Sequence, residues 1–515
     1  MLIKTFSAAV MGLEATTITI EVNLSRGVQF HLSGLADTAV KESYDRIHAA
    51  ISNIGFKPPT ASITINLSPA DIRKEGTGYD LPLAIGILAA HAKVSETALN
   101  EYMMIGELGL DGLLKPVNGA LPVAIRARAE KFKGLIVPKA NAREAAVVNN
   151  LDVYGMDNLA DVIAFFNGAM NYEPTVVDTR KEFYEHQYSF DLDFADVKGQ
   201  EAVKRALEVA AAGGHNIIMV GPPGSGKSMM AKRLPGILPP LSLAESLETT
   251  QIHSVAGKLA VGTSLISQRP FRSPHHTVSQ VAMTGGGNRA VPGEVSMAHN
   301  GVLFLDELPE FNKSTLEVLR QPLEDRKITI SRAKYTVEYP CSFMFVASMN
   351  PCPCGYYGDP THNCVCTPGQ IQRYMNKISG PLLDRIDLHC EICAVPFSQL
   401  STMQSGEPSA KIRERVIKAR QTQEARFKDF KGIHCNAQMT ERMLHQFAEP
   451  DAASLNMLRM AMERLKLSAR AYSRILKVAR TIADLDHSEK VQSQHIAEAI
   501  GYRSLDRGDW AERSL

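Results

Sequence analysis

The most informative stretch of this chain is "NIIMVGPPGSGKSMM", residues 216 to 230. A G-x-x-x-x-G-K-S spacing follows an apolar run, and the helix-forming "SMMAKRL" comes directly after the motif. In such a loop the backbone N–H groups close around phosphate oxygens, Lys227 neutralises the β and γ phosphates, and the Ser228 hydroxyl ligates Mg²⁺. A chance match is the alternative, and the flanking strand and helix patterns make it the weaker one. The predicted phosphate-binding residues are Gly221, Pro222, Pro223, Gly224, Ser225, Gly226, Lys227 and Ser228.

A second motif lies further along the chain, where "GVLFLDELPEF", residues 301 to 311, supplies an apolar run that ends in Asp306 and Glu307. Such an acidic pair is what ATP hydrolysis requires, because Asp306 would bind Mg²⁺ through water and Glu307 would polarise the attacking water. Taken alone, an Asp-Glu pair at a strand end is more often a helix cap. Together with the phosphate loop it favours catalysis, so ATP and Mg²⁺ are the predicted cofactors.

The organisation of the chain follows from its length and its hydrophobic patterns. With 515 residues the chain is too long for one hydrophobic core, and about three domains are expected. Short alternating strands such as "ATTITIEVNL" mix with helices near the N-terminus, and in the middle helices alternate with apolar strands, which is typical of an α/β fold with a covered parallel sheet. The predicted segments are an α+β domain (1–168), a linker (169–190), an α/β core (191–396), a second linker (397–410) and a helical domain (411–515).

Charge and hydropathy argue against a protein with a uniformly basic surface and against a membrane protein. A net charge of +1 argues against a uniformly basic surface, so any nucleic-acid contact would come from local patches. The longest apolar run, Leu81 to Ala90, is broken by Pro82 and Gly86 and is far short of the roughly 20 residues of a membrane span. The first residues lack a signal-peptide core. We therefore expect no membrane segment and a cytoplasmic location.

A cluster of cysteines follows the strand that ends at Asn350. The stretch "ASMNPCPCGYYGDPTHNCVC", residues 347 to 366, contains Cys352, Cys354, Cys364 and Cys366. Four thiolates suit a closed tetrahedral zinc site, although the single-residue gaps are tighter than usual, and His362 is a spare ligand. The alternative is a set of unpaired thiols in a tight loop. If Zn²⁺ binds, its position just after Asn350 indicates a structural role.

The order of these motifs resembles that of an AAA+ ATPase, and within that superfamily the magnesium-chelatase-like group called YifB or ComM. The resemblance covers nearly the whole chain and includes "RPFRSPHHT" (269–277) and "ISGPLLDRIDLH" (378–389). It implies that Asn350 is a sensor that orients the lytic water, where the alternative role is a polar strand cap. It also implies a ring of identical subunits, a hexamer, in which Arg385 reaches the γ phosphate of a neighbour. Asp384 and Asp387 could instead form salt bridges with Arg385.

The same resemblance assigns a nucleotide-sensing arginine to the helical tail. In "LSARAYSRILKVARTIADL" the apolar residues share one helical face, and Arg470, Arg474 and Lys477 share the opposite one. Arg474 is the predicted sensor and Arg470 the second choice, while an ordinary solvated basic face is the alternative. Between Arg459 and Arg480 the only acidic residue is Glu463, so we expect a basic patch. This patch could bind DNA or the ATP of an adjacent subunit.

Two insertions set the expected substrate. The Gly- and His-rich segment 253–300 and the hairpin around "SRAKYTVEYP" (331–340) resemble the helix-two insert and the pre-sensor hairpin, which line the central pore of related rings. The resemblance implies that Arg332 and Lys334 at the hairpin tip contact DNA phosphates, which position a strand without reading its sequence. An exposed hairpin with a charged tip is the alternative.

The N-terminal domain resembles the proteolytic domain of Lon. Gly78 stands at the nucleophile position and Leu121 near the lysine position, and neither can perform acyl transfer. We therefore expect an α+β Lon-protease-like domain that is catalytically inert, and that assembles the ring or guides DNA through Arg73 and Lys74.

The resemblance as a whole implies an ATP-dependent, ring-forming DNA translocase or helicase that promotes branch migration or strand unwinding in recombination and natural transformation. One alternative is a chelatase-like ATPase that remodels a protein partner for metal insertion. The other is an ATP-dependent protease, against which Gly78 argues.

Overall fold

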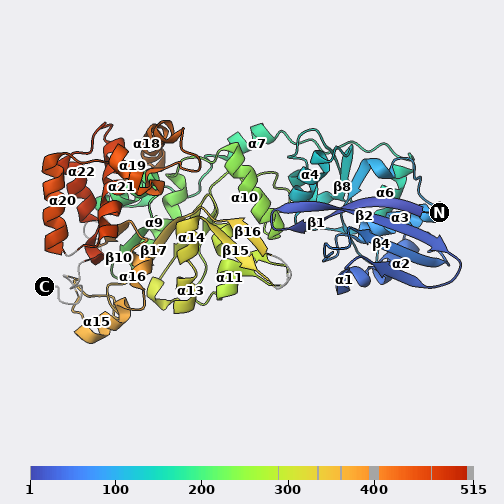
Figure 1. Cartoon of the computed structure of the whole chain (residues 1–515), viewed down its shortest axis with the longest axis horizontal. Coiled ribbons are helices and arrows are strands. Elements are labelled where there is room, and N and C mark those ends of the chain that lie inside the picture. The colour runs from blue at the N-terminus through green and yellow to red at the C-terminus, as the bar shows by residue number, and fades with distance from the viewer. Residues whose placement is uncertain are drawn as a thin grey trace.

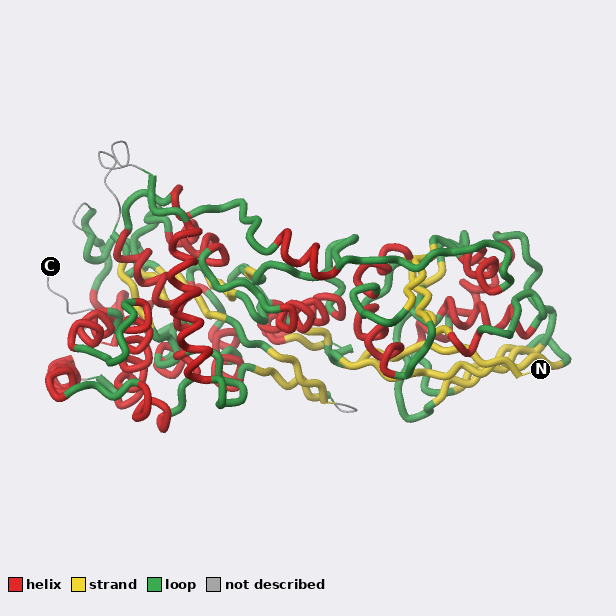
Figure 2. Tube along the Cα trace, turned by 90° about the horizontal axis from the view of Figure 1, so that it is seen from above, coloured by secondary structure: helices red, strands yellow, loops and turns green. Residues whose placement is uncertain are grey.

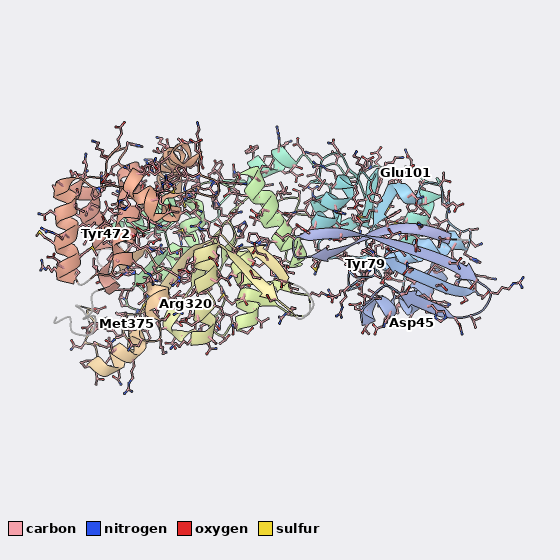
Figure 3. All side chains as sticks on the ribbon, in the orientation of Figure 1. Asp45, Tyr79, Glu101, Arg320, Met375 and Tyr472 are labelled. Carbon is pink, nitrogen blue, oxygen red and sulfur yellow. The ribbon has the colours of Figure 1, made fainter. Side chains whose placement is uncertain are left out.

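The structure is a computed structural model of the chain and describes residues 2–287, 289–332, 336–359, 362–393, 405–465 and 467–506. The molecule is elongated, with a seven-stranded sheet at one end, a five-stranded sheet in the middle and a group of helices at the other end (Figures 1 and 2). Tyr79 and Asp45 lie at the end with the larger sheet and Tyr472 lies among the helices at the opposite end (Figure 3).

The N-terminal sheet has the strand order β3-β4-β2-β1-β5-β8-β9 and is mixed. Strands β1 and β2 are antiparallel, as are β2 and β4, and the remaining pairs are parallel. The alternating "TITIEV" pattern of β2 places Ile18, Ile20 and Val22 in the core, as expected for a strand with one buried face. The strands are β1 (Leu2–Met11), β2 (Glu14–Ser25), β3 (Phe30–Ser33), β4 (Ser62–Ser68), β5 (Tyr102–Met104), β8 (Gly134–Pro138) and β9 (Asp152–Met156).

Helices cover both faces of this sheet. Helix α3 (Asp80–Ala90) is buried along almost its whole length, which explains why its sequence is apolar on all sides. It packs with α2 (Ser43–Asn53) in one core, while α4 (Ala120–Ala129) packs in the other. The remaining elements are α1 (Thr38–Lys41), α5 (Ala142–Ala145), α6 (Leu159–Phe166) and the small ribbon of β6 (Glu107–Leu108) and β7 (Leu114–Lys115).

The central sheet is parallel throughout and has the order β11-β14-β17-β10-β18. The sequence predicted this mixed α/β architecture and its parallel sheet, and both are confirmed. Strands β10, β14 and β17 are buried along their full length, as expected for strands covered on both faces. The strands are β10 (Ile217–Val220), β11 (Phe271–Arg272), β14 (Val302–Leu305), β17 (Met344–Met349) and β18 (Leu388–Glu391).

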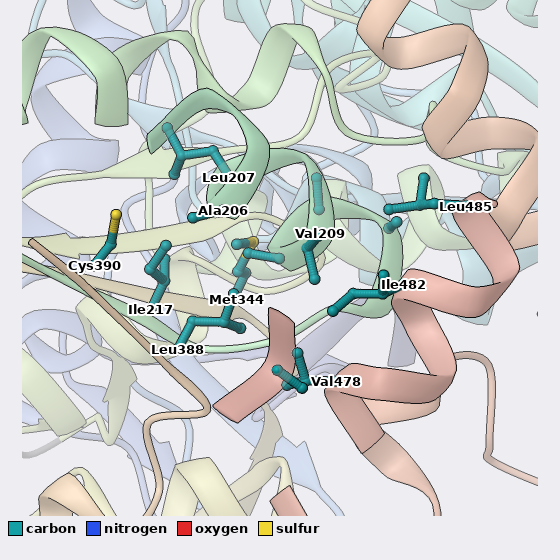
Figure 4. Close-up of a cluster of buried hydrophobic side chains, with 14 of the residues drawn as sticks. Ala206, Leu207, Val209, Ile217, Met344, Leu388, Cys390, Val478, Ile482 and Leu485 are labelled. Atoms are coloured by element: carbon teal, nitrogen blue, oxygen red, sulfur yellow. The ribbon is translucent and has the colours of Figure 1, made fainter. Parts of the chain in front are cut away.

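The principal core joins this sheet to the C-terminal helices. Figure 4 shows Ile217, Met344 and Leu388 of the sheet region, Leu207 and Val209 of α8, and Ile482 of α21 in one buried cluster. Helix α21 packs against α8, α18 and α22 and therefore anchors the C-terminal helices to the sheet. The helices are α8 (Glu201–Gly213), α9 (Lys227–Arg233), α18 (Ser409–Phe427), α19 (Glu441–Phe447), α20 (Ala452–Leu465), α21 (Ala469–Leu485) and α22 (Ser493–Gly501).

Two hairpins and several short helices are inserted around the central sheet. The predicted hairpin is present as β15 (Lys327–Ser331) and β16 (Thr336–Pro340), and a second small ribbon pairs β12 (Gly285–Gly286) with β13 (Val291–Pro292). The inserted helices are α10 (Leu243–Val255), α11 (Gln280–Thr284), α12 (Glu294–Met297), α13 (Lys313–Glu317), α14 (Arg320–Asp325), α15 (Pro368–Met375) and α16 (Gly380–Leu383).

The N-terminal part docks on these inserted elements. Helix α10 packs against α4, and the Gly119 N–H donates to the Ser254 carbonyl at 3.0 Å. Leu265 is buried in the core that contains α4. A Cβ on Gly12, in the β1–β2 turn, would lie 2.8 Å from Cγ1 of Val337 on β16, so this turn touches the hairpin.

One expected linker has structure of its own. Segment 169–190 contains α7 (Thr179–His186), which Asp178 caps, and Phe183 of this helix is 2% exposed. The sequence shows no apolar periodicity there, because Phe183 is the buried residue of this helix, and Glu182 holds it through Arg143 and Ser264.

Candidate nucleotide site

The phosphate loop lies between β10 and α9, at the carboxyl end of the parallel sheet, where ligands of such sheets bind. Gly224 and Gly226 have φ of 76° and 89°, a left-handed conformation that glycine adopts without strain. The Lys227 ammonium donates to the carbonyls of Gly221 (2.7 Å) and Pro222 (2.8 Å). Burial lowers the pKa of Lys227, and the charges of Asp306 and Glu307 oppose this shift. The lysine is therefore held inside the loop.

The two predicted Mg²⁺ ligands contact each other. Ser228 Oγ at the start of α9 donates to Asp306 Oδ2 at 2.6 Å, and Asp306 follows β14 directly. A hydroxyl and a carboxylate are oxygen ligands of the kind that Mg²⁺ prefers. The residues therefore fit a magnesium ion between the phosphate loop and the acidic strand.

Glu307 has a strained backbone and an exposed side chain. Its φ of 54° lies in the left-handed region, which costs a non-glycine residue free energy and often marks a functional position. Two acceptors fix this conformation, because the Glu307 N–H donates to Asp306 Oδ1 (3.1 Å) and to Ser348 Oγ (3.3 Å). Glu307 is therefore held in this conformation, and its side chain is exposed next to Asp306.

Asn350 completes this edge of the sheet. It follows β17, and its Oδ1 lies 3.3 Å from Lys227 Nζ. The start of the phosphate loop is joined to the same strand, because the Gly221 N–H donates to the Met349 carbonyl at 3.2 Å. Four predicted residues from three neighbouring strands, Lys227, Ser228, Asp306 and Asn350, therefore meet at one place.

Ser348 is a site residue that the sequence reasoning missed. Its hydroxyl donates to Asp306 Oδ1, so two serine hydroxyls orient the same carboxylate. The period of two along a strand places Ser348 on the face of Asn350, and that alternation is the signal that could have found it.

Arg385 is paired within its own chain. Its guanidinium contacts Glu324 of α14 and the Pro381 carbonyl, and the side chain is 12% exposed. The acids considered from the sequence, Asp384 and Asp387, pair with other residues. Its role as a finger for a neighbour's nucleotide stays a prediction.

Arg474 is bound to a buried carboxylate. Its Nη1 donates to Asp387 Oδ1 at 2.6 Å, and His215 Nδ1 lies 3.2 Å from Asp387 Oδ2. Burial disfavours the charge of Asp387, but Arg474 and His215 hold the pKa of this carboxyl well below its usual range. The second choice, Arg470, is 67% exposed and pairs with Asp384 at 3.1 Å.

Only part of the expected basic patch on α20 and α21 is exposed. Arg459 and Arg464 of α20 and Arg470 of α21 lie at the surface. Arg480 is 2% exposed and forms a salt bridge with Asp484, and Lys477 donates to the Ala437 carbonyl. Arg474 is bound to Asp387, which is distant in sequence, so a count of local charges does not reveal that pair.

The four cysteines are clustered. Sulfur–sulfur distances are 3.3 Å (Cys352–Cys354), 3.7 Å (Cys352–Cys364) and 3.6 Å (Cys354–Cys364), and all four sulfurs lie within 4.8 Å of one another. These distances are too long for disulfides, whose S–S length is about 2.0 Å, but close to the roughly 3.8 Å edge of a tetrahedron with Zn–S bonds of about 2.3 Å. The thiols fit a metal ion. The spare ligand His362 instead stacks on Tyr356 and lies 3.7 Å from Asp359.

The predicted DNA contacts are only partly described. Arg332 is exposed at the end of β15, and its Nη2 lies 2.6 Å from the position of a Cβ on Gly286, so it covers the tip of the β12–β13 ribbon. Lys334 lies outside the described residues. In the N-terminal part, Arg73 is exposed, but Lys74 is fully buried and donates to the Pro69 carbonyl, so its expected contact with DNA is wrong.

The Lon-like region has no nucleophile at the expected position. Gly78 carries no side chain, and its backbone carbonyl accepts from Gly106. Leu121 is fully buried in α4, where it packs in the core.

In the described part of the chain, no helix is both long and apolar enough to cross a membrane.

A phosphate loop, an acidic pair on the next strand but one and a polar residue on the strand between them define a P-loop ATPase of the AAA+ class. Comparison with known families agrees. Residues 193–400 match "Magnesium chelatase, subunit ChlI", residues 20–141 match "Subunit ChlI of Mg-chelatase", and residues 406–503 match "Magnesium chelatase, subunit ChlI C-terminal".

Individual relatives extend over the whole chain. Competence protein ComM of Haemophilus influenzae is 43% identical over 504 residues, which cover 98% of this chain and 97% of that protein. The uncharacterised protein YifB of Escherichia coli is 45% identical over 502 residues, covering 97% and 96% respectively. Lon protease 2 of Bacillus subtilis is 31% identical over 160 residues, covering only 28% of this chain and 27% of the protease. The chain belongs to the YifB/ComM family of magnesium-chelatase-like proteins, as its motifs predicted, and this membership implies an ATPase.

Proposed function

We propose that this protein is an ATP-dependent, ring-forming DNA translocase or helicase that promotes branch migration or strand unwinding in recombination and natural transformation. The observation that carries the proposal is the position of Arg332, exposed at the end of a hairpin and lying over the glycine tip of a second ribbon. A flexible cation beside a bare backbone suits the phosphate chain of a nucleic acid. The similarity over the full length to a competence protein supports a DNA substrate.

The chemistry of the motor follows from the residues around Asp306. Lys227 would exchange its carbonyl acceptors for the β and γ phosphates of ATP, and Ser228 and Asp306 would hold Mg²⁺, which neutralises the charge that develops on the phosphates. Glu307 would accept a proton from the attacking water, and Asn350 would orient that water. Asn350 Oδ1 lies 3.3 Å from Lys227 Nζ, which supports a position for both beside the same phosphate.

Ring assembly would complete the site. In a ring of six subunits, Arg385 would leave Glu324 and bind the γ phosphate held by the neighbouring subunit. A guanidinium that alternates between a carboxylate and a phosphate couples hydrolysis to the position of α14, which leads directly into the β15–β16 hairpin. Arg474, bound to Asp387 two residues beyond Arg385, would report the same event to the C-terminal helices.

We further propose that Cys352, Cys354, Cys364 and Cys366 hold a structural Zn²⁺. Four clustered thiols with one fully buried member suit a closed site without an open catalytic position. Metal analysis of the purified protein should find about one zinc per chain, and none after Cys354→Ser with Cys366→Ser. Zinc content equal in both proteins would contradict this assignment.

The proposed function is tested by strand displacement on a forked DNA labelled on one strand. Native protein should displace the strand only with ATP, and Lys227→Ala should be inactive. Arg332→Ala should lose displacement but keep ATP hydrolysis in the absence of DNA, because Arg332 is remote in sequence from the phosphate loop. The control is Arg26→Ala, which removes an exposed arginine just after β2, outside the hairpin.

A second outcome separates the chelatase-like alternative. If the magnesium-chelatase likeness extends to function, a protein partner and not DNA would stimulate hydrolysis. Equal displacement by native protein and Arg332→Ala would remove DNA from the hairpin, and absence of displacement by the native protein would contradict the helicase.

A further inference from the structure

We propose that the four-cysteine loop braces the phosphate loop, so that metal binding at the cysteines raises the affinity of the chain for nucleotide. The inference rests on the proposed zinc site and adds a task for it. The two loops are far apart in sequence, since the phosphate loop ends at Ser228 and the cysteine loop begins at Cys352. They nevertheless touch.

The contact is between Gly355 and Pro223. A Cβ on Gly355 would lie 2.6 Å from Cδ and 2.8 Å from Cγ of Pro223, closer than carbon atoms approach without displacement. Gly355 therefore packs its bare Cα directly on the ring of the second proline in the phosphate loop. Because Gly355 has φ of 89° and follows the ligand Cys354 immediately, metal coordination fixes the backbone that makes this contact.

The outer half of the phosphate loop has little other support. Pro223 and Gly224 are exposed, and the space around the Cα of Gly224 is open, with no atom within 4 Å of a Cβ placed there. A loop of this kind binds phosphate with its backbone N–H groups, so its affinity depends on how far its conformation is fixed before binding. The contact with Gly355 supplies that restraint from outside the loop.

The cysteine loop is itself anchored at its base. Cys352 is fully buried in the core that also contains Met349, the residue whose carbonyl accepts from Gly221. The Gly355 N–H donates to the Cys352 carbonyl at 3.0 Å, which closes a tight turn. With the metal bound, the sulfurs of Cys364 and Cys366 hold this turn from the far side. Without it, only the hydrogen bond to Cys352 and weak hydrogen bonds to sulfur restrain the turn, so Gly355 is held less firmly against Pro223.

The first test adds one methyl group at the contact. Gly355→Ala places a Cβ against Pro223 and keeps all four thiols, and Gly358→Ala is the matched control, because Gly358 has a similar φ of 77° in the same loop but nothing within 4 Å. Both variants should retain zinc. Calorimetry with ADP should show about fivefold or weaker binding for Gly355→Ala than for Gly358→Ala. Equal ADP affinity in the two variants would overturn the inference.

The second test removes the metal. Cys354→Ser with Cys366→Ser should lose zinc and bind ADP about fivefold or more weakly than Cys393→Ser, an exposed cysteine outside the cluster. Circular dichroism in each variant separates a local effect from unfolding. Loss of zinc with unchanged ADP affinity would overturn the brace and leave the zinc site intact. A native chain that contains no zinc would overturn both the brace and the zinc site. Because ADP binding is measured without DNA, these results do not depend on the translocase proposal.

Discussion

At the scale of single residues, the carboxylate of Asp306 is oriented by hydrogen bonds from two sides. Two serine hydroxyls donate to it, Ser228 from the phosphate loop and Ser348 from β17. Ser348→Ala should leave ATP affinity unchanged and lower kcat roughly tenfold, because a freed carboxylate rotates away from the metal position. Steady-state hydrolysis rates measure this. Ser7→Ala is the control, since Ser7 Oγ is also buried on a strand but has no hydrogen-bond partner among the described residues. Equal kcat in the two variants would contradict the role of Ser348.

Glu307 gives a second prediction at this scale. Glu307→Gln keeps the shape of the side chain but cannot accept a proton, so hydrolysis should fall by about 100-fold or more while ATP still binds. Filter binding of ATP and phosphate release measure the two properties. Glu310→Gln, in an exposed acid paired with Lys377, should retain native activity. Native hydrolysis by Glu307→Gln would transfer the role of base to another group.

Residues whose role depends on local sequence were predictable, and residues whose role depends on long-range pairing were not. The phosphate loop and the acidic pair are contiguous motifs, so the sequence places them correctly beside the sheet. Ser348 acts through Asp306 on another strand, so the alternation along β17 indicates the face on which Ser348 lies but not that it contacts this carboxylate. Lys74 looked like a surface cation in a polar loop, but the turn folds it back onto the Pro69 carbonyl.

At the scale of elements, α21 links the end of the sheet to the helical tail. Arg474→Ala removes the guanidinium that pairs with Asp387, whose side chain is 1% exposed, and should cost about 3 kcal/mol of unfolding free energy. Arg470→Ala removes a pair whose arginine is 67% exposed and should cost less than about 1 kcal/mol. Urea titrations compare the two. Equal stabilities, with ADP affinity lost only in Arg474→Ala, would instead support Arg474 as the nucleotide sensor.

The same helix has a pH-dependent stability. Burial, and then the charge of Arg474, lower the pKa of Lys477 to about 8 in the folded chain. The unfolded lysine titrates near 10.4, so between these values the unfolded chain binds more protons and the free energy of unfolding rises with pH. The cost of the buried ammonium is complete below pH ~8 and is lost above pH ~10.4. The stability of native protein relative to Lys477→Met should therefore increase across that interval in urea titrations, and parallel curves would contradict it.

The positions of the strands were more predictable than the ion pairs that their neighbouring helices form. Alternation located β2, and apolar runs located β10, β14 and β17, because these patterns report one or two buried faces directly. The strand β1 was not predicted, because its buried and exposed positions do not alternate regularly along its whole length. The environment of Arg474 was not predictable, because the pattern shows which residues of α21 share a face but not that Asp387 lies beside that face.

At the scale of the whole molecule, the proposed function requires nucleotide sites that two neighbouring subunits share. Glu307→Gln and Arg385→Ala should each be inactive alone, because one lacks the base and the other the guanidinium. Mixed in equal amounts and allowed to reassemble, they should recover about a quarter of native hydrolysis, the share of boundaries that combine both intact residues. No recovery, with both proteins in mixed rings, would place Arg385 in its own subunit's site. The sequence predicts such a ring only through its resemblance to a family of ring-forming ATPases. Within one chain Arg385 pairs with Glu324, and that contact does not indicate a neighbouring subunit.

We propose that ATP hydrolysis at Lys227, Asp306 and Glu307 drives movement along DNA, and the decisive measurement is the rate of ATP hydrolysis by the purified chain with and without forked DNA at low salt. DNA should raise this rate severalfold, Arg332→Ala should reduce the increase, and the increase should fall steeply as salt is raised, because phosphate contacts release counterions. An unchanged rate, in protein that also fails to retain DNA at low salt, would show that hydrolysis is not coupled to DNA.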